Sequence, residues 1–186
     1  MKKLILFEHV TLDGFVAGSN GDMSWIRVDE ALFEFASKQT AEADTALYGR
    51  VTWEMMEAYW PTAAQRPNAS RHDVVHSNWY NSVDKIVLSQ SRQGKEEGRT
   101  RFIGSNAIDY IGALKRRSGK NILMFGSPSA AHSLMEAGLV DEFWLFINPV
   151  TIGAGIRLFP AVQQQFDLVN LSRFDSGVAG MHYRKH

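Results

Sequence analysis

Glycine, hydroxyl and arginine residues occur together in three short segments, Gly49-Arg50-Val51-Thr52, Ser89-Gln90-Ser91-Arg92 and Gly126-Ser127-Pro128-Ser129. Glycine lets a backbone approach a ligand closely, hydroxyl groups donate to phosphate oxygens, and arginine offers a two-pronged donor. A helix that begins at such a segment adds free amide groups and a partial positive charge. Together the three segments predict a site for the phosphates of a dinucleotide.

Each segment also has a plainer interpretation. Glycine after a strand and serine before a helix are ordinary turn and capping residues, so the prediction requires all three segments to meet in space. Residues 153–155 read Gly-Ala-Gly, but Leu158 stands where a Rossmann fingerprint has its third glycine. The chain also contains no Walker A and no HExxH sequence.

The elements that position these segments are predicted to be parallel strands. Residues 43–49, 83–89 and 120–126 each have a polar residue at the second position, continue as an apolar run and end at Gly or Ser. That pattern is typical of strands buried on both faces. Because the carboxyl ends of parallel strands meet at one edge, the three segments should line one crevice.

Helical patterns separate these strands. One predicted helix covers about residues 29–43 and buries Leu32, Phe35 and Ala36. Asn106 and Ser127 should cap two more; the first has a stripe of Ile108, Ile111 and Leu114, and the second has Pro128 at its first position. Strands are expected at 3–10 and 141–150, and an antiparallel hairpin at 166–174 and 178–183. The fold class is therefore α/β, with a mostly parallel central sheet, helices on both faces and an antiparallel C-terminal edge.

Composition excludes several function classes. The 186 residues suit one domain spanning 1–186, and 20 basic residues balance 20 acidic ones, so no overall field attracts nucleic acid or a membrane surface. Without cysteine there is no disulfide framework, thiolate metal site or cysteine nucleophile. No signal-peptide core or membrane-spanning run occurs, so a cytoplasmic location is expected.

Five motifs in chain order carry a family resemblance: Thr11-Leu12-Asp13-Gly14-Phe15-Val16-Ala17, residues 47–54 (LYGRVTWE), 86–89 (IVLS), 125–127 (FGS) and 149–159 (PVTIGAGIRLF). Together they resemble the dihydrofolate reductase-like superfamily. The first and last motifs look closest to the C-terminal reductase domain of the bacterial bifunctional deaminase-reductase of riboflavin biosynthesis and its stand-alone relatives.

The resemblance implies an NADPH-dependent reductase. In such proteins Gly49, Arg50 and Thr52 would hold the pyrophosphate and 2′-phosphate side, and Leu88, Ser89 and Gln90 would flank the adenosine. Gly126, Ser127, Pro128 and Ser129 would meet the pyrophosphate, with Phe125 near the nicotinamide ribose. His9, Val16 and Ala17 would border the nicotinamide. The family often has two glycines where this chain has Gly126-Ser127.

The riboflavin-type reaction would place a hydride on the sugar carbon of a phosphorylated ribosylamino-pyrimidine. Asp13 is the candidate catalytic residue, to orient the substrate or relay a proton, although Asp before Gly is also a common turn residue. Folate enzymes carry a carboxylate in their first helix where Phe33 stands here, with Glu34 turned about 100 degrees away. A dihydrofolate or pterin reductase is therefore an alternative, as is a non-catalytic NADPH-binding or sensing module.

His72 and His76 are spaced for one helical face, but no third ligand has supporting spacing, so a solvated helix surface is favoured over a metal site. No metal is predicted. Trp53 is expected in the core, and residues 61–70 as a surface loop. Relatives in this branch often pair, so a homodimer is expected.

Overall fold

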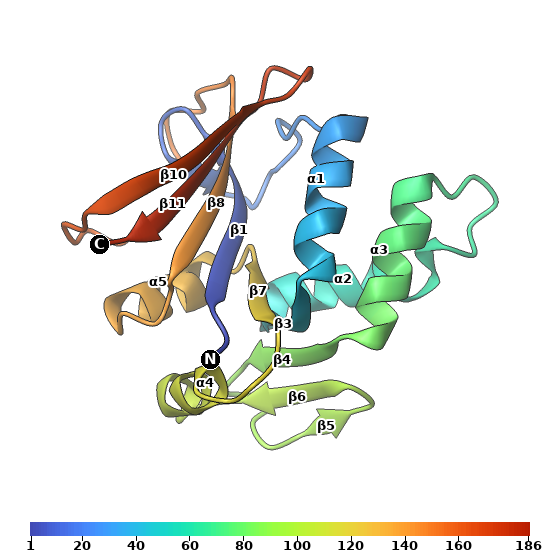
Figure 1. Ribbon diagram of the computed structural model, residues 1–186, viewed down its shortest axis with the longest axis vertical. Helices are drawn as coiled ribbons and strands as arrows, with labels where there is room; N and C mark the ends of the chain where they lie inside the picture. Colours follow the sequence, from blue (N-terminus) through green and yellow to red (C-terminus); the bar gives the residue numbers. More distant parts are fainter.

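The computed structural model describes residues 1–186 as a three-layer α/β structure (Figure 1). Nine strands form one sheet in the order β10-β11-β8-β1-β7-β3-β4-β6-β5. They are β1 (Leu4–Thr11), β3 (Ala43–Gly49), β4 (Asp84–Leu88), β5 (Glu96–Glu97), β6 (Thr100–Ile103), β7 (Asn121–Phe125), β8 (Glu142–Asn148), β10 (Phe166–Arg173) and β11 (Ala179–Lys185). Two short strands, β2 (Phe15–Ala17) and β9 (Ile156–Arg157), pair separately beside the end of β1.

The centre of the sheet is parallel and its edges are antiparallel. β1 pairs in parallel with β7 and β8, β3 with β7 and β4, and β4 with β6. The C-terminal hairpin β10–β11 adds antiparallel strands to β8, and β5 does the same to β6. The predicted α/β class, the mostly parallel sheet and the antiparallel C-terminal hairpin are confirmed.

Five helices cover the two faces: α1 (Glu30–Ala41), α2 (Arg50–Ala63), α3 (Arg71–Ser82), α4 (Ala107–Lys115) and α5 (Pro128–Glu136). Helices α1, α2 and α3 lie on one side of the sheet, and α4 and α5 on the other (Figure 1). Their side chains join the buried clusters on those faces. None of the helices has the length and apolar character needed to cross a membrane.

Successive side chains of β1 point to opposite faces of the sheet and so enter two different core clusters. Leu4, Leu6 and Val10 join the cluster under α4 and α5, while Ile5 and Phe7 join the cluster under α1. Glu8 has the same parity as Leu4, Leu6 and Val10, so a carboxyl group occupies a position where the alternating pattern calls for an apolar side chain.

Some of the predicted helix-capping residues are confirmed and others are not. Asp29 caps α1 by accepting from the Leu32 N–H at 2.8 Å, and Pro128 is the first residue of α5. Asn106 begins α4 without a side-chain cap, and Ile108 is 39% exposed, contrary to the predicted stripe. Residues three apart advance by about 300 degrees on a helix, so a stripe built on that spacing alone drifts off the buried face.

The predicted loop at 61–70 is wrong in its first part, because α2 continues through Pro61 to Ala63. Two side chains of α3 bond to the carbonyls beside the proline: Ser77 Oγ donates to the Trp60 carbonyl at 2.7 Å and Asn81 to that of Pro61 at 3.1 Å. Tertiary packing therefore supports a helical turn that the sequence alone disfavours.

Candidate coenzyme and substrate cleft

The structure brings the three predicted segments to one edge of the sheet. β7, β3 and β4 are neighbours and parallel, so the residues that follow them share that edge. The Gly49 N–H donates to Ser127 Oγ at 2.7 Å, which joins the first and third segments directly. Ser89 follows β4, whose last residue Leu88 lies opposite Gly49 in the ladder.

The turn between β7 and α5 is shaped by two consecutive left-handed residues. Gly126 has φ +54° and Ser127 has φ +63°, the single non-glycine residue with positive φ. A Cβ added at Gly126 would lie 3.3 Å from Thr52 Cγ2, so the missing side chain leaves space beside Thr52. Ser127 does not cap α5 as predicted, because its hydroxyl accepts from Gly49 and lies 3.2 Å from the Phe125 carbonyl.

The two predicted arginines are already paired. Arg50, the first residue of α2, makes bonds of 2.9 and 2.8 Å from one nitrogen to the two carboxylate oxygens of Glu54. Arg92 lies over the Trp53 ring at 5.0 Å and 3.4 Å from Glu97. Both ion pairs are at the surface, where exchange of a carboxylate for a phosphate costs little.

A cleft of about 410 Å³ lies where this edge meets α1, α2 and α3. Eight of the predicted coenzyme residues line it: His9, Val16, Ala17, Thr52, Phe125, Gly126, Ser127 and Pro128. The other six predicted coenzyme residues, Gly49, Arg50, Leu88, Ser89, Gln90 and Ser129, are not among its lining. The coenzyme roles of all fourteen stay predictions.

Glu8 is a lining residue that the sequence analysis did not select. Its side chain is buried, and its Oε2 atom has no hydrogen-bond partner. Burial raises the pKa of Glu8 to about 8, an effect that the backbone N–H groups of His9 and Gly126 only partly offset. The signal that could have identified it is an acidic residue in register with the buried apolar residues of β1.

The other end of the cleft is aromatic. Trp60 from α2 packs on His76 at 4.1 Å between ring centres, and Phe33 from α1 stacks on His72 at 4.0 Å and 13°. His76 is 9% exposed, so the predicted solvated helix surface is wrong for it. Burial lowers the pKa of His76 to about 3 and also lowers that of His72, which keeps both imidazoles neutral.

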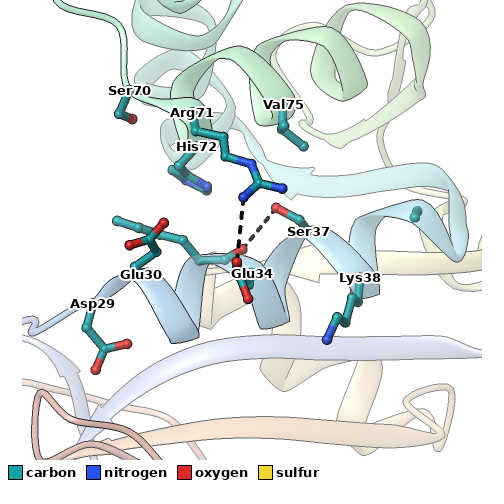
Figure 2. A pocket seen from close by; sticks show the side chains of 11 residues that line it. Asp29, Glu30, Glu34, Ser37, Lys38, Ser70, Arg71, His72 and Val75 are labelled. Atoms are coloured by element: carbon teal, nitrogen blue, oxygen red, sulfur yellow. Dashed lines mark hydrogen bonds and ion pairs between the residues drawn. The ribbon is translucent and has the colours of Figure 1, made fainter.

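Next to this aromatic end, a second hollow of about 600 Å³ opens between α1 and α3 and shares Phe33 and His72 with the cleft. Figure 2 shows Arg71 reaching from α3 toward Glu34 on α1, where the two groups lie 3.7 Å apart. Phe33 faces the cleft and Glu34 is exposed, as the sequence analysis predicts. The carboxylate that folate enzymes carry on this helix therefore has no counterpart at Phe33.

Asp13 does not lie among the residues of the cleft. Its carboxylate accepts from Thr11 Oγ1 at 2.6 Å, from the Gly153 N–H at 2.8 Å and from the Ile152 N–H at 3.1 Å. The Thr11 hydroxyl, followed by these backbone N–H groups, holds its pKa below the usual range. The carboxylate joins the β1–β2 turn to residues 152–153, as the turn interpretation expects, and the catalytic role of Asp13 stays a prediction.

The end of the cleft at Thr52 and Gly126 fits the diphosphate of a dinucleotide. A side chain at Gly126 would fill the space beside Thr52, and the free Oε2 of Glu8 leaves one buried polar atom for a ligand to satisfy. The N-termini of α2 and α5 both begin at this edge, at Arg50 and Pro128. Among the described residues no group of three or more His, Cys, Asp or Glu is arranged to hold a metal ion.

Comparisons with known proteins agree with this geometry. The uncharacterized protein YyaP of Bacillus subtilis (strain 168) is 34% identical over 188 residues, which cover 98% of this chain and 94% of YyaP. Dihydrofolate reductase from Enterococcus faecalis complexed with NADP(H) has the same fold, with TM-score 0.65, 15% identity and coverage of 99% and 96%.

The bifunctional diaminohydroxyphosphoribosylaminopyrimidine deaminase/5-amino-6-(5-phosphoribosylamino)uracil reductase of Thermotoga maritima shares the fold as well. Its TM-score is 0.68 at 18% identity, and the match covers 100% of this chain and 57% of that one. The family model described as the RibD C-terminal domain matches residues 2–179. The chain therefore belongs to the RibD C-terminal domain family, and this membership supports an oxidoreductase of the riboflavin-pathway type.

Proposed function

We propose that the protein is an NADPH-dependent reductase that transfers a hydride to a small ring-bearing substrate. The observation that carries the proposal is the continuity of the cleft: one end is formed by Thr52 and Gly126, and the other by Phe33 and Trp60. A dinucleotide in the first end would present its nicotinamide toward a ring held in the second, the proximity that hydride transfer requires.

Each end has its own task. Gly49, Thr52 and residues 126–129 would hold the diphosphate through backbone amides, hydroxyls and the α5 N-terminus. Val16 and Ala17 are buried and line the cleft, so they would exclude water from one side of the nicotinamide. Bound NADPH supplies the hydride, and the protein supplies orientation and a dry site.

The aromatic end favours a flat, uncharged acceptor. No lysine or arginine lines the cleft, and burial lowers the pKa of all three of its imidazoles, His9, His72 and His76. The resembled reaction reduces a phosphorylated ribosylamino-pyrimidine, whose phosphate would have to reach the rim near Arg71. The pyrimidine is therefore the first substrate to test, together with unphosphorylated analogues.

The deciding experiment mixes purified protein with NADPH and the ribosylamino-pyrimidine phosphate, then with a panel of carbonyl, imine and pterin compounds. Oxidation is followed as loss of the reduced-nicotinamide absorbance, and we expect turnover with at least one acceptor. Saturable NADPH binding without turnover over the whole panel would favour the second candidate, a non-catalytic binding or sensing module. Turnover with dihydrofolate alone would favour the pterin alternative.

Arg50 tests the choice of coenzyme. Once released from Glu54, its guanidinium would reach the 2′-phosphate, so Arg50→Ala should weaken NADPH binding about tenfold and NADH binding hardly at all. Titration by protein fluorescence gives both constants, and Arg116→Ala, at an exposed position at the end of α4, is the matched control. Equal losses for the two coenzymes would remove Arg50 from this role.

Homodimer formation is also part of the proposal. The outermost strand β10 exposes Leu168, Val169 and Leu171, which together form an apolar edge suited to a second copy. Light scattering across a concentration series reports the mass directly, and a monomer at every concentration would contradict this part. We further propose a cytoplasmic location, where NADPH is supplied.

A further inference from the structure

One oxygen of the Glu8 carboxyl group, Oε2, lies beneath the coenzyme end of the cleft without a hydrogen-bond partner. A Cβ built at Gly126 would lie 3.8 Å from Glu8 Oε2, which places the carboxyl directly under the β7–α5 turn. The side chain is 9% exposed and lines the cleft, and its Oε2 atom has no hydrogen-bond partner. Burying a polar atom without a hydrogen bond costs free energy. The free Oε2 atom therefore points to a ligand that supplies the missing hydrogen bond.

No charge lies against this carboxyl. The β7–α5 turn contributes Gly126, Ser127 and Pro128, none of which ionises, and β8 contributes Leu145 opposite Glu8 in the ladder. From α2 the cleft receives Thr52, while Arg50 is bonded to Glu54.

The other titratable groups that line the cleft with Glu8 are His9, His72 and His76. Burial lowers the pKa of His72 and of His76. On β1, burial lowers the pKa of His9 to about 4, so its imidazole stays neutral. Burial is therefore the dominant influence on Glu8.

The consequence is a proton donor at neutral pH. Burial raises the pKa of Glu8 to about 8, so below that pH the group carries a proton that it can donate. An ionised carboxylate at this point would repel a diphosphate bound between Thr52 and Gly126, whereas a protonated one can donate to its oxygens or to a ribose hydroxyl.

We propose that Glu8 is a coenzyme-binding residue that, in its protonated form, donates a hydrogen bond to an oxygen in the nicotinamide riboside diphosphate half of the dinucleotide. This rests on the proposed function in that NADPH is taken as the ligand. It adds an acidic residue on the first strand to the set implied by the family resemblance, and it makes coenzyme affinity depend on pH.

The test is NADPH binding between pH 7 and 9.5 in wild type, Glu8→Gln and the exposed control Glu136→Gln, with fluorescence or calorimetric titration. Phosphate monoesters titrate near pH 6, so this range isolates Glu8 from the coenzyme. The wild-type dissociation constant should rise about tenfold per pH unit above 8, as should that of the control. Glu8→Gln, whose amide still donates, should match wild type at pH 7 and stay flat.

A second measurement needs no variant. Calorimetry of wild type at pH 8.5 in buffers of different ionisation enthalpy should show uptake of somewhat less than one proton per NADPH, since most Glu8 is ionised before binding. A flat wild-type profile, equal pH dependence in Glu8→Gln, or no proton uptake would overturn the inference.

The failure of the proposed function gives a different result. NADPH that binds with the expected pH dependence but is never oxidised would leave the role of Glu8 standing and remove the reductase. If NADPH binds and is oxidised but its affinity is the same in Glu8→Gln and wild type at every pH, the reductase stands and the role of Glu8 falls. Absence of NADPH binding at pH 7 in wild type would end both.

Discussion

Glu8 and Glu142 are both buried acids on neighbouring strands, β1 and β8, but their surroundings are opposite. Glu142 accepts from Lys3 at 2.7 Å and lies 3.0 Å from His182 Nε2, whereas Glu8 Oε2 has no partner. Burial alone would raise both pKa values; for Glu142 these two partners outweigh burial and hold the pKa below its usual range. A carboxyl group paired within the protein serves the fold, and one left unpaired beside a cleft is available to a ligand.

The two acids also lie at opposite ends of the sheet. Glu142 begins β8 and is level with Ile5, while Glu8 lies three residues further along β1, near the carboxyl edge where the predicted coenzyme segments meet. At the edge of Glu142, charged side chains bond to one another, as in the Lys115–Asp141 pair at 2.7 Å. At the carboxyl edge, Glu8 Oε2 is instead left without a partner, and it lies where open α/β sheets place their binding sites.

The largest expected effect is on the pH dependence of stability. The pKa of Glu8 rises from 4.5 in the unfolded chain to about 8 in the folded one, so its favourable contribution is complete below pH 4.5 and is lost as pH rises to 8. Urea unfolding of the protein without coenzyme measures the free energy of unfolding. Within this pH window the value for Glu8→Gln should rise relative to that of wild type by up to about 1.4 kcal/mol per pH unit. A constant difference between the two proteins would mean that Glu8 ionises normally.

Removing the paired acid should have the opposite sign. Glu142→Gln leaves Lys3 and His182 without their carboxylate, and we expect a loss of about 2 kcal/mol in the free energy of unfolding at pH 7, because Lys3 is half exposed and recovers some hydration. The contribution of Glu142 is present above its unfolded pKa of 4.5 and disappears as pH falls through the lower folded value. Glu136→Gln, exposed on α5, is the control and should change little.

This contrast also explains what the sequence could predict. Strand 43–49 was predicted at its observed bounds, because an apolar run ending in glycine reports burial on both faces. The shared edge of residues 49 and 127 followed from the prediction of parallel strands, whereas their direct hydrogen bond was not predicted. Features that depend on local periodicity or on the parallel direction of the strands could therefore be predicted from the sequence.

Features that depend on contacts with other helices and strands could not be predicted from the sequence. Glu8 interrupts the apolar alternation of β1, but its place beside the cleft arises from Gly126 and Thr52, which lie far away along the chain. His76 is buried because Trp60 of α2 packs on it, a contact that no spacing within α3 reveals. Pro61 stays helical because α3 bonds to adjacent carbonyls. Tertiary contacts determined all three outcomes.

The smallest expected effect concerns Ser127, which builds the coenzyme edge without ionising. Ser127→Ala leaves the Gly49 N–H without its acceptor and should cost about 1 kcal/mol of unfolding free energy. Ser127→Gly loses the same bond but relieves a left-handed backbone at φ +63°, worth about 1 kcal/mol, so the two terms nearly cancel. Thermal unfolding should therefore rank glycine above alanine at this position. The reverse order would show that the backbone of Ser127 is not strained at φ +63°. The hydroxyl is tested separately by comparing Ser127→Ala with wild type, and equal stability of these two proteins would show that the bond to Gly49 does not hold the two turns together.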